Sequence, residues 1–261
     1  MDALVTAVCA AGGLVLGDEL EIVVERTGAH RGLERPWWGC PSCAAPAPAA
    51  ALVPVVRSFA WGRGCPACRH VRPRAWRPLV LGVVSAAVLG GFAARIGPDA
   101  ALAPFCVFGL ALVAISAVDL ERQIIPNRLV YPTLVTVAVL LVVASAADGA
   151  WHAVTWAAIA GAGAFAAFLV VHLAVPRGMG FGDVRLAGVT GMATGWLGLG
   201  RAFVGFLAAF VLGAAVGIAA MAVSGAGRKT RIPFGPFLAA GAVVTVLWGG
   251  PVAHSLFHRG T

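Results

Sequence analysis

The 261-residue chain is 60% hydrophobic and 11% charged, and its mean hydropathy is +0.90. Soluble domains carry about 25% charged residues, so this composition excludes an ordinary soluble protein and indicates a membrane protein. The net charge of +8 would favour nucleic-acid binding in a soluble protein. Here most basic residues lie between apolar segments, so membrane topology explains them better and no nucleic-acid partner is expected.

Eight segments are apolar and close to the roughly 20 residues that a membrane-spanning helix needs. In chain order they are 3–22, 78–94, 99–118, 129–147, 151–175, 184–200, 201–224 and 234–252. The first follows Asp2 rather than a basic stretch, so it does not resemble a cleavable signal peptide. The sequence therefore predicts an all-α polytopic membrane protein with about eight transmembrane helices.

The basic residues are distributed unevenly between the two sides that these helices define. If the N-terminus lies outside, the segments that face the cytoplasm hold 16 of the 19 Lys and Arg residues. These segments are 19–77, 119–128, 176–185 and 225–233. Such an excess on one side is what the positive-inside rule describes, so an outside N-terminus is expected.

One segment differs in kind from the rest. Residues 23–77 hold nine arginines and four cysteines and are too polar to enter the membrane. We therefore expect three parts: a first transmembrane helix (1–22), a cytoplasmic insert (23–77) and a seven-helix membrane domain (78–261).

The cysteines of the insert form two C-x-x-C pairs separated by 21 residues, Cys40 with Cys43 and Cys65 with Cys68. This spacing suits a tetrahedral structural zinc ion. Disulfides or redox-active dithiols are the alternative, but a reducing cytoplasm disfavours structural disulfides. The insert has few large apolar side chains, so a metal would supply folding free energy that its core lacks.

Two aspartates lie at the expected cytoplasmic ends of helices. Asp119 ends the apolar run 113–118 and precedes Pro126, while Asp183 directly precedes the segment 184–200. Either one alone would be explained as a helix cap or an interfacial charge. Both aspartates are expected at the same depth on the cytoplasmic side of the membrane. Ionisable groups there are energetically unfavourable, so two carboxyl groups at one depth indicate a functional role. An ionised carboxylate takes a proton from water while a neutral carboxyl donates one, so the sequence predicts a catalytic pair.

Glycines precede the second aspartate at positions 178, 180 and 182. Because glycine lets another backbone approach closely, we expect Gly178, Gly180 and Gly182, together with Pro126, to line a cleft for an extended substrate. Glu121 is two residues from Asp119 and points to another helix face, so it ranks below the pair.

A transporter or ion relay that uses Asp119 and Asp183 is the alternative function. Transporters place carboxylates and broken helices near the midplane of the bilayer. The two aspartates are expected at the inner surface instead, which favours an enzyme.

Five segments carry a further resemblance. They are Gly13–Gly17 with Val23–Arg26, the two C-x-x-C pairs, Asp119–Asn127, Gly180–Leu186 and Ile232–Phe237. In this order they resemble the type IV prepilin leader peptidases, also called prepilin peptidase/N-methyltransferases, a family of GxGD-type aspartyl proteases. The resemblance implies a bacterial plasma-membrane enzyme that cuts the basic leader from a prepilin, or from a pseudopilin of a protein-secretion system.

The resemblance also implies a second activity, methylation of the new N-terminal amine with S-adenosylmethionine. No residue is assigned to the methyl donor, because no glycine-rich nucleotide fingerprint follows a strand. The chain departs from the family pattern at several positions. Arg185 stands where lysine is frequent, Asp18 and Glu21 stand where small or neutral residues are usual, and Arg77 stands near an expected glutamate.

Overall fold

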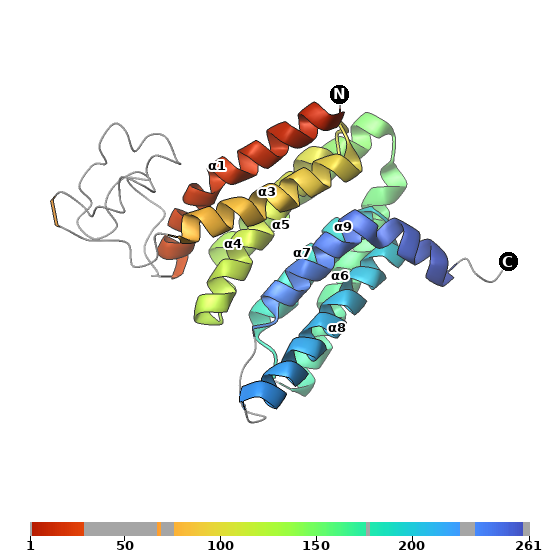
Figure 1. Ribbon diagram of the computed structural model, residues 1–261. Coiled ribbons are helices and arrows are strands. Elements are labelled where there is room, and N and C mark those ends of the chain that lie inside the picture. Colours follow the sequence, from red (N-terminus) through yellow and green to blue (C-terminus); the bar gives the residue numbers. More distant parts are fainter. Residues whose placement is uncertain (1, 29–66, 69–75, 176–177, 225–232, 258–261) are drawn as a thin grey trace. The chain divides into compact units, whose positions relative to one another are not determined.

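The computed structural model describes residues 2–28, 67–68, 76–175, 178–224 and 233–257. Within these ranges the secondary structure is helical and there is no strand (Figure 1). The helices of the described residues are α1 (Asp2–Gly28), α3 (Arg77–Ile96), α4 (Leu102–Arg122), α5 (Asn127–Asp148), α6 (Trp151–Ala174), α7 (Phe181–Trp196), α8 (Leu199–Ser224) and α9 (Gly235–Phe257). The all-α prediction is confirmed, and the helices follow the expected apolar segments in order.

Five of the described helices are long and apolar enough to cross a membrane. They are α3, α4, α5, α6 and the Leu199–Ala222 part of α8. Two further apolar stretches, Asp2–Gly17 in α1 and Gly235–Gly250 in α9, are shorter. The chain is therefore a polytopic helical membrane protein.

Several helix boundaries differ from the expected ones, and two of the differences show how the helices pack. Helix α1 continues to Gly28 instead of ending at residue 22, because Glu21 is buried and bonded to Arg77 at 3.3 Å. The polar end of α1 thus packs against α3 rather than entering the insert. The boundary expected between residues 200 and 201 instead falls between Trp196 and Leu199, where Gly198 adopts a φ of +125°. Most of the expected insert, including Cys40, Cys43 and Cys65, lies outside the described residues.

The chain divides into two compact units, Met1–Ala94 and Arg95–Thr261. In the first unit, α1 and α3 pack antiparallel through small residues. A Cβ on Gly17 would overlap the backbone of Gly82, and one on Gly13 would lie 2.6 Å from the amide nitrogen of Ala86. Small residues allow such close approach between helices in membranes, where hydrophobicity alone does not drive association.

Helix α7 is the central element of the second unit and contacts α5, α6, α8 and α9. Glycines permit its close packing on α6: a Cβ on Gly191 would lie 2.6 Å from the carbonyl oxygen of Ala160, and one on Gly195 would overlap the side chain of Ala160. At the end of α7, Trp196 Nε1 donates a hydrogen bond to Ser145 Oγ of α5 at 2.8 Å. Contacts along the whole of α7 thereby fix the position of its first turn.

We expect Gly17→Ala to destabilise the chain by about 2 kcal/mol, because the added methyl group forces α1 away from α3. The matched control is Gly12→Ala, since a Cβ at Gly12 has no atom within 4 Å. The control should be neutral or slightly stabilising, as alanine favours a helix over glycine. Thermal unfolding in detergent measures both variants, and equal effects would contradict the observed packing of α1 on α3.

Candidate active site

Asp119 lies in the last turn of α4, and only 4% of its surface is exposed. The backbone N–H of Gly235, the first residue of α9, donates a hydrogen bond to Asp119 Oδ2 at 3.0 Å. The first N–H groups of a helix lack partners within the helix, and its N-terminus carries partial positive charge. A buried carboxylate therefore finds a favourable partner there, and the end of α4 is joined to the start of α9.

Asp183 lies in the first turn of α7 and precedes the expected membrane segment 184–200. It is not the N-cap residue: Gly180 occupies that position, and its N–H donates to Asp183 Oδ2 at 3.1 Å. Burial, and secondly the charge of Asp119, raises the pKa of Asp183 from 3.8 to about 6. The two carboxyl groups are thus near enough to influence each other's ionisation.

Ile125 packs between the two glycines that adjoin these aspartates. A Cβ on Gly182 would lie 2.7 Å from Ile125 Cβ. A Cβ on Gly235 would lie 2.7 Å from Asp119 Oδ2 and 3.4 Å from Ile125 Cδ1. The segment that follows α4, the start of α7 and the start of α9 therefore meet at the two carboxyl groups.

A hydrogen bond between side chains also joins the start of α7 to the start of α5. Arg185 of α7 donates a hydrogen bond from Nη1 to Asn127 Oδ1 at the start of α5. Pro126, directly before it, is the N-cap of α5 and has extended backbone. Sequence reasoning missed Ile125 as a site residue, and it missed the contact of Asn127 with Arg185 that joins the start of α5 to the start of α7. All three residues lie in the sequence segments that carry the family resemblance, but a sequence motif does not reveal the direction of a side chain.

The glycines expected to line a substrate cleft have different surroundings. Gly182 makes room for Ile125, and Gly180 donates to Asp183. Gly178 is exposed, and a Cβ there would lie 3.0 Å from Val175 Cγ1. Their contacts are therefore within the protein, and their role in substrate binding stays a prediction.

Of the four insert cysteines, Cys68 is described and is exposed. Cys40, Cys43 and Cys65 lie outside the described residues. In the part of the chain that the structure describes, no group of three or more His, Cys, Asp or Glu side chains could hold a metal ion. The zinc site stays a prediction.

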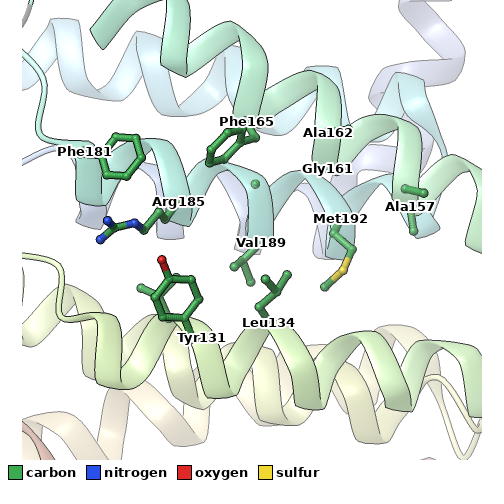
Figure 2. Close-up of a pocket in the computed structure, with 13 residues that line it drawn as sticks. Tyr131, Leu134, Ala157, Gly161, Ala162, Phe165, Phe181, Arg185, Val189 and Met192 are labelled. Atoms are coloured by element: carbon green, nitrogen blue, oxygen red, sulfur yellow. The ribbon is translucent and has the colours of Figure 1, made fainter. Parts of the chain in front are cut away.

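A pocket of about 420 Å³ lies between α5, α6 and α7 (Figure 2). Its lining residues are Val130, Tyr131, Leu134, Ala157, Ala158, Gly161, Ala162, Phe165, Phe181, Arg185, Gly188, Val189 and Met192. The guanidinium carbon of Arg185 lies 4.3 Å from the ring centre of Phe181 and 5.7 Å from that of Tyr131. The pocket is apolar apart from this arginine and the tyrosine hydroxyl.

Fold and site together define a class of protein: a polytopic helical membrane protein in which two carboxyl groups are held at helix N-termini. The model of the type IV leader peptidase family matches residues 106–218, which include both aspartates. No solved structure matches the chain.

Several curated proteins named prepilin leader peptidase/N-methyltransferase are similar to the chain over most of its length. The Burkholderia pseudomallei (strain 1026b) protein is 32% identical over 276 residues, covering 92% of this chain and 84% of that protein. The Bacillus subtilis protein is 29% identical over 242 residues, covering 92% and 93%. The chain belongs to the type IV leader peptidase family, which confirms the resemblance and favours a peptidase over a transporter.

We expect Gly235→Ala to slow leader cleavage by about 100-fold or more, because the added methyl group would displace the carboxylate of Asp119. Gly163→Ala is the matched control, since a Cβ at Gly163 of α6 has no atom within 4 Å. Both variants are assayed with a purified prepilin in detergent after their folding has been checked by circular dichroism. Cleavage by Gly235→Ala at the control rate would contradict a role for this contact.

Proposed function

We propose that this chain hydrolyses the peptide bond between the basic leader and the mature part of a prepilin or pseudopilin, with Asp119 and Asp183 as its catalytic pair. The convergence of three distant segments on these two carboxyl groups supports the proposal most directly. Gly235 donates a hydrogen bond to Asp119, Gly180 donates one to Asp183, and Ile125 packs against the neighbouring glycines Gly182 and Gly235. The names of the relatives supply the substrate class.

The two carboxyl groups have different roles in this proposal. We assign the shared proton to Asp183, because burial and the charge of Asp119 raise its pKa to about 6 and so favour its neutral form more than in an ordinary carboxyl group. Asp119 is the ionised partner, and the N–H of Gly235 stabilises its negative charge. One neutral and one ionised carboxyl group are what acid–base hydrolysis of an amide requires.

Hydrolysis then proceeds in two steps. Asp119 removes a proton from water, the water oxygen attacks the scissile carbonyl carbon, and Asp183 donates its proton to the carbonyl oxygen. The resulting tetrahedral diol returns a proton to Asp183 as its carbon–oxygen double bond re-forms. The carbon–nitrogen bond breaks, and the leaving amine takes the proton held by Asp119. Both carboxyl groups return to their starting states.

The separate variants Asp119→Asn and Asp183→Asn test the pair. Each should lower kcat for prepilin cleavage by about 1,000-fold or more, because an amide can neither accept the proton of water nor supply an acidic one. Glu121→Gln is the matched control, as it removes an exposed carboxylate two residues from Asp119. Full processing by either aspartate variant would exclude that residue from the chemistry.

We also propose that the chain crosses the bacterial plasma membrane eight times, with its N-terminus outside. This orientation is supported by the distribution of basic residues. The connecting segments assigned to the cytoplasmic side hold 16 of the 19 Lys and Arg residues. Asp119, at the end of α4, and Asp183, at the start of α7, then lie at the cytoplasmic surface, where a basic leader remains after its hydrophobic helix has entered the membrane.

The names of the relatives also support a second activity, N-methylation of the cleaved product with S-adenosylmethionine. The pocket between α5, α6 and α7 does not fit this donor. S-adenosylmethionine carries a positively charged sulfonium, whereas the pocket has Arg185 and no carboxylate among its lining residues. We therefore assign no described residue to the methyl donor.

The four insert cysteines are proposed to hold one structural zinc ion, on the strength of their two C-x-x-C pairs. Four thiolates are a donor set that binds zinc tetrahedrally and closes a structural site. The metal would stabilise the insert and would take no part in cleavage.

Purified protein should therefore contain about one zinc per chain, and Cys40→Ser or Cys65→Ser should remove most of it. Cys9→Ser is the control, since Cys9 lies within α1 and outside the insert. Zinc is measured by elemental analysis after gel filtration. A zinc content below a tenth of an equivalent in the unaltered protein, purified without chelator, would contradict the proposal.

A further inference from the structure

The pocket between α5, α6 and α7 lies on a different face of α7 from the two carboxyl groups. Arg185, at one end of the pocket, is two residues from Asp183. Side chains two positions apart leave a helix about 200° from each other, so they do not face the same neighbour. Asp183 belongs to the face near Asp119, whose charge it feels, whereas Arg185 contacts Tyr131 of α5. A molecule in the pocket would therefore not reach the catalytic pair.

The shape and lining of the pocket suit a hydrocarbon chain. Along α7 the pocket extends from Phe181 to Met192, which corresponds to about 17 Å of helix. Its walls come from α5 and α6, which are both long and apolar enough to cross a membrane. Ala158 and Ala162 of α6 line the pocket and are also exposed, so the pocket opens on the outer surface of these helices. Figure 2 shows the two walls on either side of α7.

One end of the pocket carries a positive charge. In the described part of the chain, Arg185 interacts with the amide oxygen of Asn127 and with the rings of Phe181 and Tyr131. None of these partners is negatively charged, so the guanidinium remains available to an anion. Tyrosine and other amphipathic aromatic residues are enriched at the level of lipid headgroups. An anionic group is thus expected at this end, and an apolar chain along the rest.

We propose that this pocket binds an anionic phospholipid, with one acyl chain between α5 and α6 and the phosphate on Arg185. Charge complementarity selects the anionic headgroup, and the opening between two membrane-spanning helices selects a lipid. A basic leader peptide would be repelled by Arg185. This inference goes beyond the proposed function, and its test uses no peptide substrate.

Native mass spectrometry of the full chain in detergent tests the proposal, with phosphatidylglycerol and phosphatidylcholine of identical acyl chains as competing probes. Phosphatidylglycerol should be retained about tenfold more, because its phosphate is not neutralised within its own headgroup. Arg185→Gln should remove this preference, and Arg185→Lys should keep most of it. Arg122→Gln, which removes an exposed arginine outside the pocket, should have no effect.

The apolar part of the pocket is tested separately. Ala162→Trp places an indole in the pocket from an exposed position and should lower retention of both lipids by about tenfold. Ala167→Trp is the matched control, because Ala167 is exposed on α6 outside the lining. Ala162→Trp leaves the hydrogen bond between Arg185 and Asn127 in place, so it decides the question if Arg185→Gln fails to fold.

Three results would overturn the proposal. One is equal retention of the two lipids by the unaltered protein, and another is unchanged retention in both Arg185→Gln and Ala162→Trp. The third is displacement of bound phosphatidylglycerol by a prepilin peptide, which would assign the pocket to the substrate.

Discussion

The carboxylate of Asp119 accepts the first backbone N–H of α9 from Gly235, 116 residues further along the chain. A buried carboxylate without donors is strongly unfavourable, so this contact permits an acidic side chain at the end of an apolar helix. It also joins the start of α9 to the end of α4, where the missing side chain of Gly235 leaves space for Ile125. The geometry of the site therefore depends on a helix N-terminus rather than on an ion pair, which leaves the acidic character of the carboxyl group available for chemistry.

Helix α7 connects the candidate active site to the rest of the second unit. With 16 residues it is about 24 Å long, shorter than the hydrocarbon core of roughly 30 Å. At least one of its ends must therefore be stabilised within or close to the apolar region, and Asp183 supplies a partner for the N–H of Gly180. Because neighbouring helices pack on several sides of α7, one short helix presents a carboxyl group on one face and Arg185 on another.

Two departures from the family pattern occur together in the structure. Glu21 stands where small or neutral residues are usual, and Arg77 stands near an expected glutamate. The two side chains form an ion pair at 3.3 Å, where α1 ends beside the start of α3. Each charge therefore compensates the other. The ion pair joins α1 to α3 at this end, and the close contact of Gly17 with Gly82 joins the same two helices further along.

Hydropathy, charge and spacing were sufficient to predict the membrane class and the order of the described helices, because these properties are local in the chain. They also singled out Asp119 and Asp183, which the structure brings near each other and whose catalytic role stays a prediction. They did not reveal that Asp183 is the third residue of α7, that Gly182 accommodates Ile125, or that α1 continues past residue 22 to Gly28. They also did not reveal the pocket at Arg185. Each of these features depends on contacts between segments far apart in the chain. Such contacts follow from the packing of whole helices, which only the tertiary structure decides.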